Sequence, residues 1–220
     1  MSGKGHLVPE GRRRDHQQPT RSAVTTCCGR DSAGPPPFTY PSTHHAKVDA
    51  VCVVHATKSL LDKVGLTDPA AEVESTTLLG PWYATIATGR PQLALFANEA
   101  TLLPVLLPLA PSRSVFRRFP EVLARVLATH GVDQAVIDAE VEAMEFDVTR
   151  KTASRSMTGM LVEFTFLARH VLDQTPDVDL TELSVDLAST PCSPLYKRHV
   201  GPDRELAAFL GSRPNGPDLP

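Results

Sequence analysis

The sequence has few cysteines and few aromatic residues, and each shortage narrows the class of protein. Its 220 residues include four cysteines, two of them adjacent at Cys27 and Cys28. Small secreted domains instead carry an evenly spaced set of cysteines for disulfides, so we expect a reducing, cytoplasmic setting. Aromatic residues make up only 5% of the chain. The few that are present are therefore candidates for core anchors or for a binding groove.

Long apolar runs are also missing. The longest run, 102–110, contains two prolines and is far shorter than the roughly 20 apolar residues of a membrane-spanning helix. Near the N-terminus, the basic GRRR at Gly11–Arg14 leads into polar sequence and not into the apolar block of a signal peptide. The sequence therefore predicts no membrane association and no secretion signal.

Motifs for catalysis, metals and cofactors are sparse. No glycine-rich phosphate loop is present, and the cysteines and histidines have poor spacing for one tetrahedral metal ion. One grouping could supply a nucleophile, namely Cys192 with His199 and Asp203, but it lacks a nucleophile elbow and oxyanion-hole glycines. We therefore expect no metal, no cofactor and no catalytic residues, and we interpret Cys192 as a small apolar residue of the core.

Residues 1–47 differ in composition from the rest of the chain. They hold seven Lys or Arg against three acids, a net charge of +4. Because the whole chain has a net charge of −3, the remaining residues have a net charge of −7. They also lack apolar periodicity, which predicts a disordered basic tail rich in Pro, Ser and Thr. An alternative is a gene-model extension, with the natural start near Val48 or Val51. The expected organisation is this tail, one globular domain over 48–210, and a frayed tail over 211–220.

Within the domain, short runs of β-branched and apolar residues predict strands. Gly89–Pro91 is a plausible tight connection, so the strands on either side of it should be antiparallel neighbours. Pro104 confines its strand to an edge of the sheet, because proline lacks the N–H that an inner strand donates. The expected strands begin at Val51, Trp82, Gln92, Leu102 and Phe146.

Apolar residues at helical spacing predict three main helices, beginning near Pro120, Asp133 and Ser156. Shorter helices are expected over 58–64, capped by Thr57, and from Pro202. Residues 179–190 fit neither helix nor strand well. The predicted class is α+β, with a small, mostly antiparallel sheet packed on one face by the three main helices.

Four segments in this order, TLLGPWYATI, NEATLLPVLLPL, KTASRSMTGMLVEF and TPCSPLYKRHVGPDRELAAF, resemble an uncharacterised bacterial domain family, a domain of unknown function. Its motifs have the forms LGxWYA, NExTLLPVLxPL, KTxxRSxxGxMNEF and TPxxPLYKR. The resemblance covers about Val51 to Phe209 and leaves the N-terminal segment outside. One departure is Val162, which stands where the motif has Asn. The resemblance implies no activity.

Basic residues gather at the start of the helix expected near Ser156 and again in the segment TPCSPLYKRH. A helix N-terminus attracts anions, and neighbouring hydroxyl and guanidinium groups would strengthen that attraction. If the two segments meet in space, they form an anion site; otherwise the basic residues pair with surface acids. The candidates are Arg150, Lys151, Arg155, Ser156, Lys197, Arg198 and His199.

Trp82 and Tyr83 are candidates for lining a groove, although a Trp at the start of a strand more often anchors a core. The favoured hypothesis is a non-enzymatic binding or interaction module of the bacterial cytoplasm, because no catalytic set converges. The alternative is an enzyme or nucleic-acid-processing protein that acts on a phosphate-containing ligand at the basic residues. The partner would accordingly be a protein or a phosphate-containing ligand, and the acidic net charge of the domain gives nucleic acid little support.

Overall fold

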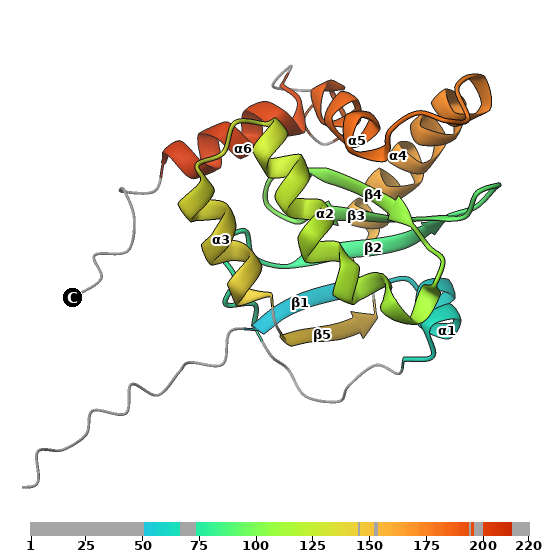
Figure 1. Cartoon of the computed structure of the whole chain (residues 1–220), viewed down its shortest axis with the longest axis horizontal. Coiled ribbons are helices and arrows are strands. Elements are labelled where there is room, and N and C mark those ends of the chain that lie inside the picture. Colours follow the sequence, from blue (N-terminus) through green and yellow to red (C-terminus); the bar gives the residue numbers. More distant parts are fainter. Residues whose placement is uncertain are drawn as a thin grey trace, which may run out of the picture. The chain divides into compact units, whose positions relative to one another are not determined.

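A computed structural model describes residues 51–66, 74–144, 146–151, 154–193, 195 and 200–212. These residues form a sheet with helices on both of its faces (Figure 1). The elements are β1 (Val51–Ala56), α1 (Lys58–Val64), β2 (Trp82–Ala87), β3 (Leu93–Asn98), β4 (Pro104–Pro108), the 3-10 helix η1 (Ser112–Ser114), α2 (Val115–Thr129), α3 (Gln134–Ala143), β5 (Phe146–Lys151), α4 (Arg155–Gln174), α5 (Leu180–Ser189) and α6 (Pro202–Gly211).

The five strands lie in the order β4-β3-β2-β1-β5, and the predicted α+β class is confirmed. β2, β3 and β4 pair antiparallel through short connections, with β4 and its Pro104 at the edge as expected. β1 pairs parallel with both β2 and β5. The sheet is therefore mixed, and the expected antiparallel pairing holds for the half formed by β2 to β4. Parallel pairing requires long crossovers, here through α1 and through the helices that precede β5.

Helices cover both faces of the sheet, so the expectation that they pack on one face was wrong. Trp82 and Phe96 belong to a first core with α1, α2, α3 and α6, whereas Tyr83 and Leu95 belong to a second core with α4 and α5. Successive side chains of a strand point to opposite faces. All six residues of β3 are buried, so this strand needs cover on both sides. In Figure 1, α2 lies in front of the sheet and α4 behind it.

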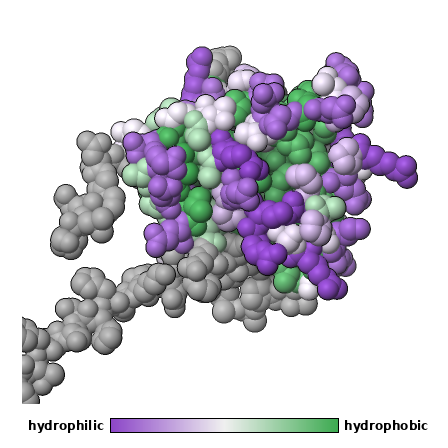
Figure 2. All heavy atoms as spheres, in the orientation of Figure 1, coloured by the Kyte–Doolittle hydropathy of each residue, from purple (hydrophilic) through white to green (hydrophobic). Residues whose placement is uncertain are grey.

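Helix α2 begins at Val115, five residues before the expected start, and contains Pro120 in its interior. Proline removes one helical hydrogen bond and normally ends a helix. Here the helix continues because its apolar stripe, from Val115 and Phe116 onwards, is buried in the first core. Its opposite side carries exposed charged residues such as Arg117, Glu121 and Arg125, and Figure 2 shows hydrophilic side chains over this helix with hydrophobic ones beside them.

The helix caps show how local sequence sets the helix ends. Asp133 accepts a hydrogen bond from the N–H of Ala135 at the start of α3. Ser154 caps α4 in the same way, 3.3 Å from the nitrogen of Met157. Asp179 caps α5, the segment that the sequence pattern did not assign. None of the described helices combines the length and apolar character that a membrane crossing requires.

Candidate functional site

The carboxyl end of β2 extends past the end of its neighbour β1. The last residue of β1, Ala56, pairs with Ala84, whereas β2 runs on to Ala87. On the other side, β3 pairs with β2 over its whole length. The last three residues of β2 therefore have a neighbouring strand on one side only.

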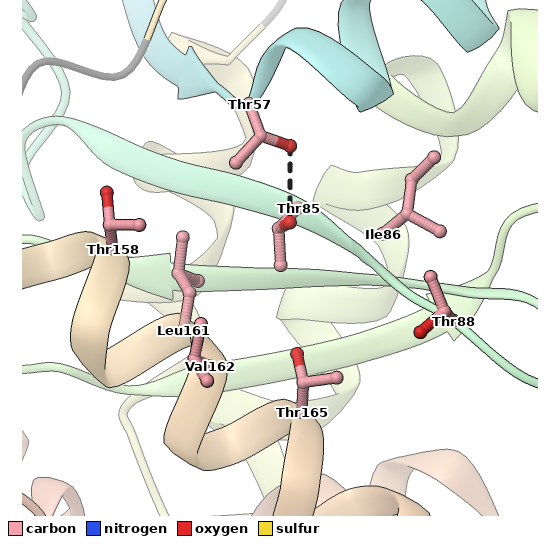
Figure 3. A pocket seen from close by; sticks show the side chains of 8 residues that line it. All are labelled: Thr57, Thr85, Ile86, Thr88, Thr158, Leu161, Val162 and Thr165. Atoms are coloured by element: carbon pink, nitrogen blue, oxygen red, sulfur yellow. Dashed lines mark hydrogen bonds between the residues drawn. The ribbon is translucent and has the colours of Figure 1, made fainter.

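A cavity of about 350 Å³ lies between this open part of β2 and helix α4 (Figure 3). We call it the threonine crevice, because five of its eight lining residues are threonines and none is charged. Figure 3 shows Thr85 between Thr57 and the side chains of α4. The lining residues are Thr57, Thr85, Ile86, Thr88, Thr158, Leu161, Val162 and Thr165.

The threonine hydroxyls of the crevice differ in their partners. The Oγ1 atoms of Thr57 and Thr85 lie 3.2 Å apart and share a hydrogen bond. Thr158 donates to the carbonyl oxygen of Ser154, one helical turn earlier, at 2.8 Å. Thr88 and Thr165 make no side-chain hydrogen bond to any residue that the structure describes. A hydroxyl donates one hydrogen bond and accepts two, so the crevice keeps hydrogen-bonding capacity for a ligand.

Local sequence explains why β1 stops where it does. The carbonyl oxygen of Thr57 accepts from the N–H groups of Leu60 and Leu61, so the chain turns directly into α1. Thr57 occupies the N-cap position of α1, as predicted, but its hydroxyl does not cap the helix and instead shares hydrogen bonds with the hydroxyls of Ser59 and Thr85. Gly65 ends the helix with a left-handed φ of 79°.

The other wall of the crevice is helix α4, which contacts the sheet through apolar packing and through hydrogen bonds of one arginine. Leu161 and Phe164 are buried in the second core. Further along, the guanidinium of Arg169 donates to the carbonyl oxygens of Ala87 and Pro91 in the β2–β3 connection. Gly89 has a positive φ of 134°, and a Cβ there would lie 2.7 Å from that guanidinium, so a side chain at this position would strain the backbone and displace Arg169.

The crevice lies at the carboxyl ends of the parallel strands. β1 and β5 are neighbours, and Ala56 pairs with Lys151, the last residue of β5. From these two ends the chain leaves toward opposite faces, into α1 in the first core and into α4 in the second. Such a divergence, in sheets with parallel strands, leaves an opening outside the strand ends where ligands bind.

The structure describes only part of the predicted basic cluster. Arg155 and Ser156 are the first two residues of α4, and both are exposed. Arg150 and Lys151 are placed by their backbone at the end of β5, close to the end of β1. The remaining three basic residues, 197–199, lie outside the described residues. The joint cluster therefore stays a prediction.

The described part of the segment TPCSPL packs against α4. Cys192 and Leu195 are buried in the second core, and the N–H of Ser193 donates to Glu163 of α4 at 3.4 Å. Burial, with a smaller contribution from the charge of Glu163, raises the pKa of the Cys192 thiol to about 11. The thiol is thus protonated at neutral pH, which suits a core residue and not a nucleophile.

The two candidate groove residues lie inside the protein. Trp82 is fully buried in the first core, edge-on to Phe119 at 4.9 Å between ring centroids. Tyr83 is buried in the second core, stacked on His55 at 4.7 Å, and its hydroxyl donates to Glu99 at 3.3 Å. Burial, followed by the charge of Glu99, raises the pKa of Tyr83 to about 12. Both side chains are placed as core anchors.

Sequence reasoning missed two polar features. The first is Glu140 of α3, which is fully buried and accepts from the N–H groups of Leu78 and Leu79, the former at 2.7 Å. Its position three residues after Ile137 and four before Met144, both buried, places it on the apolar face of its helix. The second is the threonine crevice, whose walls come from segments far apart in the sequence.

No group of three or more His, Cys, Asp or Glu side chains that could hold a metal ion occurs among the residues that the structure describes. No curated protein and no solved structure matches the chain. A family model, however, matches residues 53–205, which is most of the chain. The protein therefore belongs to the family DUF6933, a domain of unknown function.

Proposed function

We propose that this protein is a non-enzymatic binding module of the bacterial cytoplasm, and that it holds a small, uncharged ligand in the threonine crevice. The observation that supports this proposal is the open end of β2 beside α4, lined by five threonines and three aliphatic residues. The volume of about 350 Å³ lies at the lower end of the range of small-molecule sites. A small molecule fits this volume better than a folded partner does.

The lining chemistry favours an uncharged ligand. None of the eight lining side chains carries a charge, so a charged ligand would lose its hydration without gaining an opposite charge. The hydroxyls of Thr88 and Thr165 supply hydrogen bonds, and Leu161 and Val162 supply apolar contact. A few polar groups in a mostly aliphatic wall are typical of sites that fix the orientation of a small molecule.

The same lining favours binding over catalysis. A threonine becomes a nucleophile only beside a base, and none of the eight lining residues titrates near neutral pH. General acid–base catalysis likewise requires a group whose pKa lies near the working pH. The crevice therefore supports recognition of a ligand without a chemical step.

Two matched variants test the site. Thr158 lines the crevice and Thr129 lies on α2; both are exposed helical threonines whose hydroxyl donates to the carbonyl four residues earlier, at 2.8 and 2.9 Å. Thr158→Phe should fill the crevice, and Thr129→Phe should not, while both lose the same kind of hydrogen bond. The measurement is ligand-observed NMR with a library of small uncharged fragments.

Fragments that bind the wild-type chain and the Thr129→Phe variant should lose their saturation-transfer signal with Thr158→Phe. Unchanged signals with Thr158→Phe would refute binding in the crevice. So would a library in which no fragment gives a signal with the wild-type chain.

A second candidate function is the binding of a phosphate-containing ligand at the start of α4. It is favoured by one observation, namely that Lys151 ends β5 beside the end of β1, at the edge where α4 begins with Arg155. Here the combined Arg155→Ala and Arg198→Ala variant should weaken binding of inorganic phosphate or a nucleotide and flatten its salt dependence. Binding of equal strength and equal salt dependence in the variant would exclude this candidate.

A further inference from the structure

We infer that the ligand of the threonine crevice carries a hydrogen-bond acceptor next to a donor on one edge, as in a cyclic amide or another nitrogen heterocycle, and that the main chain of Ile86 recognises this pair. The inference rests on the proposed function and adds the chemical class of the ligand. It follows from the direction in which the backbone groups of β2 point.

Two hydrogen bonds fix that direction. The N–H of Thr57 donates to the carbonyl oxygen of Ala84 at 2.9 Å, so the backbone groups of Ala84 point toward β1. The N–H of Glu99 donates to the carbonyl oxygen of Pro81 at 3.0 Å, so Pro81 points toward β3. Neighbouring residues of a strand direct their N–H and C=O groups to opposite edges. Ile86, two residues after Ala84, therefore points its N–H and C=O away from β3.

Beyond the end of β1, these two groups have no strand to pair with. In a continued parallel ladder, the N–H of Ile86 would donate to the carbonyl oxygen of Thr57. That oxygen is already used by Leu60 and Leu61 at the start of α1. Within the part of the chain that the structure describes, neither backbone group of Ile86 has a hydrogen-bond partner on this edge.

Ile86 contributes its main chain to the crevice, since its side chain points to the opposite face of the sheet. The side chain packs against the first core, on the α1 side of the sheet, whereas α4 lies on the other side. In Figure 3, the side chain of Ile86 accordingly points away from α4. Ile86 nevertheless lines the cavity, so its backbone N–H and C=O are the groups that it offers to a ligand.

One donor and one acceptor from the same residue require the complementary pair on one edge of the ligand. Cyclic amides, in which the ring holds the amide in the cis form, and many nitrogen heterocycles carry such an edge on a planar, uncharged group. A plane of this kind would contact Leu161 and Val162 with its face while the hydroxyl of Thr85 or Thr165 bonds its rim. An unpaired backbone group that becomes buried without a partner weakens binding, so ligands without the pair should be disfavoured.

The test compares uracil with 1,3-dimethyluracil. Uracil has an N–H beside a C=O, and methylation removes both N–H groups while keeping the ring and its carbonyls. Titration of the ¹⁵N-labelled full chain should shift the amide signal of Ile86 with uracil. The amide of Thr85, which pairs with β3, should shift less. We expect uracil to bind about tenfold more tightly than 1,3-dimethyluracil, the effect of one lost hydrogen bond.

A backbone variant provides an independent measurement. Ile86→Pro removes an N–H that the β2–β3 ladder does not use, together with the side chain that packs against the first core, and proline is tolerated at such an open edge. With the spectrum otherwise retained, uracil binding should fall about tenfold. If this variant fails to fold, the Ile86 amide shift and the uracil-to-dimethyluracil ratio in the wild-type chain still decide the question.

The outcomes separate this inference from the proposed function. Equal binding of the two compounds, or an Ile86 amide that does not move, would overturn the inference; fragments that bind the wild-type chain but not Thr158→Phe would then still support the crevice. If no fragment binds the crevice at all, the proposed function and this inference fail together.

Discussion

The polar groups near the two ends of β2 differ in their hydrogen bonding. At the amino end, Asn98 is fully buried, donates to the carbonyl oxygen of Leu79 at 2.9 Å and accepts from the N–H of Thr101 at 2.9 Å. Close by, Glu140 accepts from the N–H of Leu78. Both side chains bond to backbone groups, as most buried polar groups do, whereas the buried indole N–H of Trp82 at this end has no partner among the described residues.

At the carboxyl end, the hydroxyls of Thr88 and Thr165 and the backbone of Ile86 have no such partners within the described residues. They border a cavity and not a packed interior. Buried polar groups that are hydrogen-bonded within the protein stabilise the fold. Polar groups without such partners around a cavity are available to bind a ligand. Changes at the amino end should therefore affect stability, and changes at the carboxyl end should affect binding.

The largest effect is expected for Glu140→Ala. The change leaves the N–H groups of Leu78 and Leu79 without their acceptor, which should lower the free energy of unfolding by about 3 kcal/mol. Urea denaturation followed by circular dichroism measures this. The matched control is Glu142→Ala, an exposed glutamate on the same helix, which should change stability by less than about 0.5 kcal/mol. If the two variants lowered the free energy of unfolding equally, the hydrogen bonds of Glu140 would not stabilise the amino end of β2 as proposed.

A second effect concerns Tyr83, whose pKa is raised from 10.0 to about 12. A group whose pKa is higher in the folded state contributes stability that is complete below its unfolded pKa and is lost as the pH rises through the folded value. Stability should therefore fall by about 2 kcal/mol as the pH rises from 10 toward 12.

Urea denaturation at several alkaline pH values, with tyrosinate absorbance recorded in parallel, measures this loss. Tyr83→Phe should lack that part of the pH dependence. A Tyr83 phenol that titrates at its ordinary pKa would contradict the prediction.

A smaller effect on stability, with a clear effect on binding, is expected for Thr85→Val. Valine has nearly the same shape but loses the hydrogen bond to Thr57, which spans 3.2 Å and is only partly buried. The free energy of unfolding should fall by about 1 kcal/mol or less. The affinity for uracil should fall several-fold, because one hydroxyl of the crevice wall is lost. Loss of stability as large as for Glu140→Ala would show that the two ends of β2 do not differ as proposed.

The smallest effect is expected from removal of residues 1–47. The family match begins at residue 53, and we propose that the globular unit over 48–210 carries both the fold and the crevice. A chain that starts at Val48 should unfold at the same urea concentration as the full chain and bind uracil equally well. Weaker binding in the shorter chain would assign part of the ligand site to the N-terminal segment.

Much of the fold follows from local patterns. All five strands were predicted within two residues of their starts, including the hairpin around Gly89 and the edge position of Pro104. Helices α3 and α4 begin within one residue of the starts expected at Asp133 and Ser156. Such features depend on neighbours a few residues away, so the sequence alone suffices to predict them.

The candidate site was predicted less well. Local patterns drew attention to Trp82 and Tyr83, yet both lie in the core, while the basic residues are only partly described. Threonines such as Thr85 gave no signal, because a threonine in a strand is an ordinary residue. The start of α2 was predicted too late, at Pro120. The helix begins at Val115 because burial of Val115 and Phe116 outweighs the hydrogen bond that proline removes.

The sequence by itself determined the starts of the five strands and most of the helices, but not α5 or the start of α2. Only the tertiary structure decided that β1 pairs parallel with β2 and β5, that helices cover both faces, and that β2 extends past β1. An apolar stripe shows that a helix is buried but not against which face of the sheet it packs. The crevice depends on those choices, because it forms where α4 crosses a strand end that its neighbour leaves open.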